Sequence, residues 1–418
     1  MDERLHDYRR ARKQFFDRYG ARWPDTLADE FDILAPCALS RAEAQSVLAT
    51  AHGLARIYGR AAQLLRNLSD DALLAMGVPE HLLRIVRCDI PGMADCVVGR
   101  FDLAPAGQGY KMLEFNADVP GFMVEAFSVN AAVCRHEGVC DPNDGGEQEL
   151  ASALVSAVDA GVRYTGKRVG EAATVVVTSV GSYGRDRALA EYCSGLLQDR
   201  AAQYHPVESL GIDGEGLYDP SGKRIDVLYR FLQLRSIRNE LFRPHGPRVP
   251  TELGGMLLKL VEERRLAIIN PPMSFLLEGK ALQAVIWNLA ESQQYFSEEE
   301  RGLIQAYMLP TYLDPPNDGT AFVMKPAYGA EGDTVRVVAA SGEVTHTSAY
   351  TSLLHQAMVY QRYVEWAPEE MMTEYGQRRL HVVTSCFVLG GKPCGIFRRA
   401  GDAITNEMAW VLPVSIRG

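Results

Sequence analysis

The chain has 418 residues, which is enough for two or three domains or for one large composite enzyme. With 47% hydrophobic and 23% charged residues, its composition is ordinary for a soluble globular protein. The net charge of -10 disfavours nucleic acid or an anionic membrane as a partner, and no apolar run approaches the roughly 20 residues of a membrane helix.

The N-terminal region, residues 1–86, is predicted to be mostly helical because Ala, Leu and Arg dominate it. At its start, apolar side chains at helical spacing predict an amphipathic helix: Leu5, Tyr8, Phe15, Phe16 and Tyr19. This stretch is charged throughout and lacks the apolar core of a signal peptide. The cysteines form no CxxC pair, so reduced thiols in a cytoplasmic protein are the simplest expectation.

Residues 94–116 predict a β-hairpin with a Pro/Gly-rich turn. Arg100 and Asp102 share one face of the first strand, and Glu114 and Asn116 share one face of the second. The acidic and amide side chains supply the oxygen ligands that hard divalent cations prefer, whereas the arginine is placed to hold an anion. A solvated polar face is the alternative, and the turn length leaves the strand register open.

The middle of the chain predicts an α/β unit. A helix over 147–163 precedes a short buried strand, a glycine turn and a second helix, together spanning 172–197. The turn holds Gly181 and Gly184 but is not GxGxxG, so an ordinary α/β turn is favoured over a nucleotide site.

Two further strands are predicted over 224–231 and 266–272, and an apolar helix opened by Lys280 follows. The local pattern leaves two roles open for this lysine, namely a phosphate contact or a solvated helix position. The last third of the chain is rich in predicted strands.

The segment FVMKPAYGAEGDTVRVV, residues 322–338, carries the strongest single signal. A β-run leads to Lys325, and a loop with Gly329 and Gly332 then leads into a second strand rather than the helix of a Walker loop. Glycines let backbone N–H groups approach phosphate oxygens, and the lysine adds a cation. This pattern favours a nucleotide site over an ordinary hairpin with a surface lysine.

Four segments resemble the glutathionylspermidine synthetase family in the same order along the chain, from about residue 97 to 415. GRFDL and MLEFNAD resemble the family's RFDF and EYNAD, and INPPMSFLLEGKAL resembles INPPWSLLLSNKAIL. VMKPAYGAEGDTV resembles LKPPYGREGANV, and the stretch from FVLGGKPCGIFRRAG to ITNEMAWVLP resembles the family's C-terminal PAGIGIRE and LITNN elements.

The resemblance implies a mixed α/β chain with a circularly permuted ATP-grasp fold, a Rossmann-like pre-ATP-grasp subdomain and a glycine-rich lid. We expect a helical region plus the metal-binding hairpin over 1–130. The pre-ATP-grasp-like subdomain would follow over 131–275, and the lid and the C-terminal ATP-grasp core over 276–418. The permutation would explain why the candidate metal ligands precede the lysines in the sequence.

The resemblance also implies roles for particular residues. Asp102, Glu114 and Asn116 would hold two Mg²⁺ ions between the phosphates of ATP, and Arg100 would contact the transferred phosphoryl group. An arginine would close on the phosphates, with Arg399 preferred to Arg398 although an alignment gap leaves the choice open. The remaining ATP-binding positions would be Lys280, Lys325, Gly329, Ala330, Glu331, Gly332, Gln361 and Tyr363.

The activity implied is amide formation. ATP phosphorylates a carboxylate, an amine attacks the acyl phosphate, and ADP and phosphate are released. Two other classes stay open, namely a catalytically inactive ATP-binding regulator or scaffold, and a small-molecule kinase that stops at phosphoryl transfer.

The substrate positions depart from the family pattern. Val119 and Gly121 replace serines that hold glutathione, and Arg235 stands where we place a glutamate of the polyamine site. The lid shows Ala330 and Thr334 in place of arginine and asparagine. We therefore expect another small carboxylate, an amino acid or short peptide, and another amine, with no nucleic acid or membrane partner; a homodimer is compatible with these features.

Overall fold

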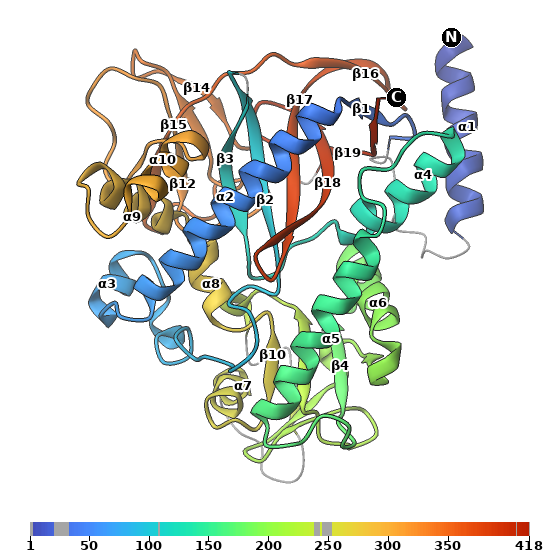
Figure 1. The fold of residues 1–418 in the computed structure, drawn as a ribbon, viewed down its shortest axis with the longest axis vertical. Helices are drawn as coiled ribbons and strands as arrows, with labels where there is room; N and C mark the ends of the chain where they lie inside the picture. The colour runs from blue at the N-terminus through green and yellow to red at the C-terminus, as the bar shows by residue number, and fades with distance from the viewer. Residues whose placement is uncertain are drawn as a thin grey trace.

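A computed structural model describes residues 3–20, 33–107, 109–237, 243–244, 253–406 and 408–417. These residues form a mixed α/β structure with sheets of two, three, four, five and six strands (Figure 1). The predicted mixed α/β class is confirmed, whereas the predicted division after residues 130 and 275 stays a prediction. None of the described helices combines the length and apolar character needed to cross a membrane.

The six-stranded sheet is antiparallel and joins segments from distant parts of the chain, with β2 and β3 paired to late strands in the order β19-β18-β17-β2-β3. Its strands are β2 (Val98–Ala106), β3 (Gly109–Asn116), β16 (Glu369–Thr373), β17 (Gly376–Leu389), β18 (Lys392–Gly401) and β19 (Trp410–Leu412). The predicted hairpin is confirmed, but its turn is shorter than expected because β2 continues to Ala106. Pro105 is tolerated there because the pairing of β2 with β17 has already ended at Leu103.

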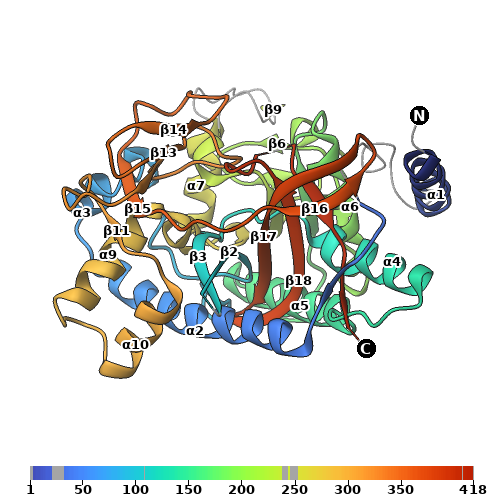
Figure 2. The same cartoon turned by 90° about the horizontal axis from the view of Figure 1, so that it is seen from above.

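Helix α2 (Arg41–Leu65) covers one face of this sheet and begins with a capping box at Ser40. Figure 2 shows it running beneath β2, β3, β17 and β18. The Tyr58 ring lies 5.5 Å from Phe101 and 4.8 Å from Phe115, measured between ring centroids. Because side chains alternate along a strand, these aromatic residues leave the charged and amide side chains of the hairpin on the opposite face.

A parallel sheet forms a second layer in the order β10-β8-β4-β5. Its strands are β4 (Val175–Ser179), β5 (Gln203–Tyr204), β8 (Val227–Phe231) and β10 (Ala267–Ile269). Helices α5 (Gly146–Tyr164) and α6 (Gly184–Leu196) pack on it. Strands β4 and β8 are buried along their whole length, as expected for a parallel sheet covered on both faces. The predicted α/β unit is therefore confirmed.

The third layer is an antiparallel sheet in the order β11-β15-β12-β13-β14. Its strands are β11 (Thr311–Tyr312), β12 (Phe322–Pro326), β13 (Arg336–Val338), β14 (Val344–Thr347) and β15 (Met358–Arg362). The predicted glycine loop connects β12 to β13. Helices α8 (Met273–Glu278), α9 (Lys280–Glu291) and α10 (Glu298–Tyr307) follow the parallel sheet in the chain and lead into this layer.

The remaining elements lie around these layers. The predicted amphipathic helix is confirmed as α1 (Glu3–Gly20), with Phe16 buried and the Phe15 ring 5.1 Å from His136. The other helices and strands are β1 (Cys37–Leu39), α3 (Asp70–Ala75), η1 (Glu80–Leu82), η2 (Val124–Val129), α4 (Asn130–Glu137), η3 (Gln198–Arg200), η4 (Val207–Ser209), β6 (Gly211–Ile212), β7 (Leu217–Tyr218), η5 (Leu234–Ser236), β9 (Arg243–Pro244), α7 (Leu253–Glu262) and β20 (Val414–Ile416).

Asn270, which directly follows β10, connects the parallel sheet to the hairpin through side-chain hydrogen bonds. It is fully buried, and its Oδ1 accepts hydrogen bonds from the backbone of Val97 at 2.9 Å and Val98 at 3.0 Å. Its Nδ2 donates to the carbonyls of Val98 at 2.8 Å and Ala117 at 2.7 Å. One amide therefore holds both ends of the hairpin in place.

We expect Asn270→Ala to lower the free energy of unfolding by about 2–4 kcal/mol, because it leaves several buried backbone groups without partners. Urea denaturation followed by circular dichroism measures this change. Asn67→Ala is the matched control, since the exposed Asn67 makes a hydrogen bond only within its own local turn. Equal midpoints for the two variants would contradict this connecting role.

Candidate active site

A cavity of about 640 Å³ lies between the hairpin and the layers around it. It is lined from the six-stranded sheet, from the junction of α8 and α9, and from the β12–β13 loop. Every residue of the predicted metal-ligand, ATP-binding and catalytic set lines this one cavity: Arg100, Asp102, Glu114, Asn116, Lys280, Lys325, Gly329, Ala330, Glu331, Gly332, Gln361, Tyr363 and Arg399.

Asp102 is the most heavily bonded carboxylate of the cavity. Arg100 donates to its two oxygens at 2.8 and 2.9 Å, and Arg399 donates at 2.7 Å. Asn116 Nδ2 donates at 3.2 Å, and the hydroxyl of Ser385 donates at 2.7 Å. Burial alone would raise the pKa of Asp102, but the two guanidinium groups outweigh it and hold that pKa well below its usual range.

The strand register, open at the level of sequence, places Asp102 directly opposite Glu114 and Arg100 opposite Asn116. Glu114 pairs with Lys280, whose Nζ lies 3.1 Å from Glu114 Oε2. Burial opposes ionisation of Glu114, yet Lys280 lowers its pKa below the usual value. The hairpin therefore presents two ionised carboxylates side by side.

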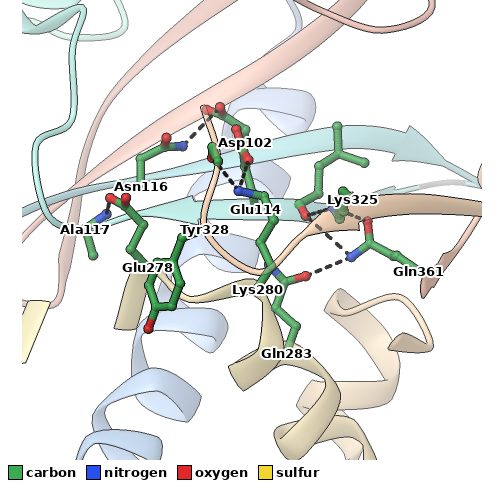
Figure 3. A network of polar contacts seen from close by, with 12 residues as sticks. Asp102, Glu114, Asn116, Ala117, Glu278, Lys280, Gln283, Lys325, Tyr328 and Gln361 are labelled. Atoms are coloured by element: carbon green, nitrogen blue, oxygen red, sulfur yellow. Dashed lines mark hydrogen bonds and ion pairs between the residues drawn. The ribbon is translucent and has the colours of Figure 1, made fainter. Parts of the chain in front are cut away.

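Lys280 is the first residue of α9. Its backbone N–H donates to the Ala327 carbonyl at 2.8 Å, and its Nζ donates to the Gly329 carbonyl at 2.8 Å. The ammonium group thus lies between Glu114 and the start of the glycine loop, as Figure 3 shows for Glu114 and Lys280. The structure places Lys280 in the cavity wall and not on a solvated helix face.

Lys325 lies on β12, and its Nζ donates to the Leu113 carbonyl at 2.9 Å and to Gln361 Oε1 at 2.8 Å. Gln361 in turn donates to Gln283 Oε1 at 2.8 Å (Figure 3). Burial lowers the pKa of Lys325 to about 7, and the nearby charge of Lys280 adds to the decrease. A phosphate beside Lys325 would restore its charged form.

The glycine loop bends sharply beside the cavity, with Glu331 at φ 57° and Gly332 at φ 72°. A Cβ atom on Gly332 would lie 2.9 Å from the Thr405 carbonyl and 3.0 Å from Ile404, so this position needs glycine. Thr334, which stands at the lid position where the family pattern has asparagine, is buried, and its hydroxyl accepts from the Leu353 backbone at 3.0 Å. This hydrogen bond stabilises the loop.

The structure separates the two candidate arginines. In the sheet, Arg399 pairs with Val383 and shares the face of Asp102, whereas Arg398 pairs with Thr384 on the opposite face. Arg398 does not line the cavity; it donates to Thr384 at 3.2 Å and to Tyr110 at 3.3 Å. Arg399 is thus the arginine available to a ligand, and its role stays a prediction.

The hairpin also has a donor set that suits Mg²⁺, because the two carboxylates and the amide oxygen of Asn116 are hard oxygen ligands on one face. Among the residues that the structure describes, no group of three or more His, Cys, Asp and Glu side chains is arranged to hold a metal. Mg²⁺ in proteins is commonly held by one or two carboxylates together with the phosphates of a substrate, and the donor set of the hairpin has that composition. Asp102, Glu114 and Asn116 remain predicted ligands.

Several lining residues were not predicted to belong to the site. Glu278 lies two residues before Lys280 and could have been noticed as a lone acid in an apolar segment. Tyr183 lies in the turn for which an ordinary α/β role was favoured, and Arg185 and Asp186 follow it, yet all three line the cavity. Ser385, which contacts Asp102 but does not itself line the cavity, gave no local signal, because only strand pairing brings it to Asp102.

Some of the positions that depart from the family pattern line the cavity, and others do not. Val119 and Gly121 line the cavity, as do Gln233 and Ser236. Arg235 is not among the described lining residues, and its guanidinium donates to Gln233 at 2.9 Å. A cationic side chain at a polyamine site would repel the substrate, but Arg235 does not reach the cavity to do so by direct contact.

Because the pKa of Lys325 is lowered to about 7, we expect the ATP binding implied by the motif resemblance to weaken as the pH rises above 7. Binding phosphates then requires the neutral amine to take up a proton, so the dissociation constant should increase by up to about tenfold per pH unit. Isothermal titration calorimetry between pH 7.5 and 9.5 measures this trend. Lys325→Arg should flatten it, because a guanidinium stays protonated, and a flat wild-type profile would contradict the prediction.

The fold and the cavity together define a mixed α/β protein with a charged cavity bordered by a glycine loop. The chain matches the family described as glutathionylspermidine synthase preATP-grasp over residues 4–417. It belongs to this family, and the family predicted from its motifs is confirmed.

Comparison with curated proteins finds no match. Among solved structures, the chain is similar to a glutathione synthetase-like effector from Globodera pallida, in its apo form. The two are 13% identical, with a TM-score of 0.58, and the alignment covers 100% of this chain and 98% of the effector, which indicates a shared fold. A gamma-glutamylcysteine synthetase-like protein from Methylobacillus flagellatus KT shows 10% identity and a TM-score of 0.36, with 91% and 87% of the chains covered.

Proposed function

We propose that this protein is an ATP-dependent carboxylate–amine ligase with a circularly permuted ATP-grasp fold. The main support for this proposal is that side chains from distant parts of the chain line one cavity. They are the paired acids of β2 and β3, the lysines of α9 and β12, an arginine of β18 and the glycine loop. Membership of a synthase family supports it.

Each part of the cavity has a task in this proposal. Lys280 and Lys325 bind the phosphates of ATP, and the loop from Gly329 to Gly332 covers them. Two Mg²⁺ ions, held by the acids and the amide of the hairpin, would screen the phosphate charge. Gln361 and Tyr363 border the adenine.

The reaction explains why so many cations are needed. A carboxylate and a protonated amine do not condense in water, and phosphorylation supplies the missing leaving group. Its transfer brings the anionic carboxylate against the anionic γ-phosphate, and Arg100 and Arg399 stabilise the charge that accumulates. The acyl phosphate is easily hydrolysed, so a closed loop is needed to exclude water.

The substrates proposed are a small carboxylate, such as an amino acid or a short peptide, and an amine. Val119 and Gly121 line the cavity and offer no side-chain hydrogen bonds to glutathione at these positions. The pair is therefore proposed to differ from glutathione and spermidine.

The test is ADP release with amino acids and dipeptides as acids and a panel of amines, followed by mass spectrometry. ADP formation that depends on both substrates, with a new amide, supports ligation. A phosphorylated product without condensation indicates a kinase. ATP binding without turnover across the panel indicates a regulator.

A further inference from the structure

The junction of α8 and α9 places a carboxylate in the cavity that the roles above do not use. Glu278 ends α8 and lines the cavity two residues before Lys280. Figure 3 shows Glu278 and Gln361 on opposite sides of Lys280. If the adenine lies beside Gln361, Glu278 lies toward the other end of the bound nucleotide, where the substrates meet.

The position of Glu278 is fixed by its surroundings. The backbone N–H groups of Ala117 and Asp118 donate to its Oε2 at 3.2 and 2.9 Å. The neighbouring Gly279 has no room for a side chain, since a Cβ atom there would lie 2.9 Å from the Tyr328 hydroxyl. Among the described residues, Glu278 Oε1 has no hydrogen-bond partner, so this oxygen is available to a ligand.

The charges around Glu278 do not neutralise it by direct contact. Asp118 is already satisfied, because it pairs with the buried Arg230 and accepts the Leu234 N–H at 2.7 Å. Glu278 forms no ion pair within the described residues, although cations lie nearby. The titratable and charged groups that influence it or are influenced by it are Cys96, Arg100, Asp118, Arg235, Lys280 and Tyr328.

Burial raises the pKa of the Glu278 carboxyl to about 7, and the Asp118 carboxylate adds to this increase. The backbone N–H of Asp118 and the charges of Lys280 and Arg235 act in the opposite direction but do not prevail. A carboxylate in this state gains from a cationic ligand, and its pKa suits proton transfer near neutral pH.

The motif segment INPPWSLLLSNKAIL has a serine where this chain has Glu278. Glu278 is therefore one of several positions, together with Met273, Phe275 and Gly279, at which this segment departs from the motif. It adds a negative charge to a wall of the cavity whose neighbouring positions, Val119 and Gly121, also differ.

We propose that Glu278 binds the ammonium group of the amine substrate and removes one proton from it. This inference rests on the proposed ligase function. In the reaction, the ammonium gives a proton to Glu278, and the freed lone pair attacks the acyl carbon. The C–N bond forms as the bond between carbon and the phosphate oxygen breaks, and the second proton leaves with the phosphate.

Hydroxylamine separates this role from a structural one, because it is uncharged at neutral pH and needs no base before it attacks. Wild type is first assayed with ATP, Mg²⁺, hydroxylamine and each of the twenty amino acids or glutathione, measuring ADP and hydroxamate. The acid found is then coupled to putrescine, spermidine, glycine amide and L-lysine between pH 6 and 9.

We expect Glu278→Gln, which keeps an oxygen for the two backbone donors, to form hydroxamate within about threefold of wild type. Coupling to the cationic amines should fall by roughly 10²–10³-fold, and its rise with pH through about 7 should disappear. The matched control is Glu291→Gln at the exposed end of the following helix, α9, where the Tyr312 hydroxyl donates to the carboxylate, and it should leave both reactions unchanged.

Three outcomes would overturn the inference: equal loss of both reactions, loss of neither, or a wild type that forms hydroxamate but couples no cationic amine. A wild type that releases no ADP with any acid would overturn the proposed ligase function itself. The two failures are therefore distinguishable.

Discussion

We expect Glu114→Gln to lower ADP-forming turnover by roughly 10²–10³-fold while the protein stays folded. The amide keeps the shape of the side chain and one oxygen beside Lys280, but it removes a negative charge directly opposite Asp102. The predicted Mg²⁺ site would lose a charged ligand, and Lys280 would lose its counterion.

The measurement is ADP release at saturating ATP over a range of Mg²⁺ concentrations, with a thermal melt to verify folding. Asn116→Ala should behave similarly, because it removes the third predicted oxygen ligand. Glu343→Gln, an exposed acid in the turn before β14, is the control for loss of one charge. Near-normal turnover of either site variant would mean that the metal assignment is wrong.

We expect Arg230→Met to lower the free energy of unfolding by about 3–5 kcal/mol. Arg230 and Asp118 are each 1% exposed and form a buried ion pair. Arg230 also donates to the Leu232 carbonyl at 2.5 Å. Removing the cation leaves the buried Asp118 carboxylate without its counterion, which costs more than losing a surface pair.

Denaturant unfolding of four proteins tests this expectation: wild type, Arg230→Met, Asp118→Asn and the double variant. The double variant should recover a large part of the loss, since it buries no charge, and the cycle gives the coupling energy of the pair. A single-variant loss below about 1 kcal/mol would show that the pair contributes no more than an exposed one.

The sequence alone determined much of the local structure of this protein. Successive side chains of a strand point to opposite faces of the sheet. The sequence alone therefore predicts that Glu114 and Asn116, two residues apart, lie on the same face. The glycine loop after Lys325 and the α/β unit were visible for the same reason, since both depend on residues that are neighbours in the chain.

Only the tertiary structure decided how these pieces meet. Ser385 lies 283 residues from Asp102 in the sequence, yet strand pairing brings it within hydrogen-bond distance. The same pairing selects Arg399 over Arg398, because a shift of one residue moves a side chain to the other face of a sheet. Such pairing depends on packing between distant segments, which leaves no local signal in the sequence. Packing between distant segments likewise brings the start of α6 to the cavity, which is why it was not predicted to line it.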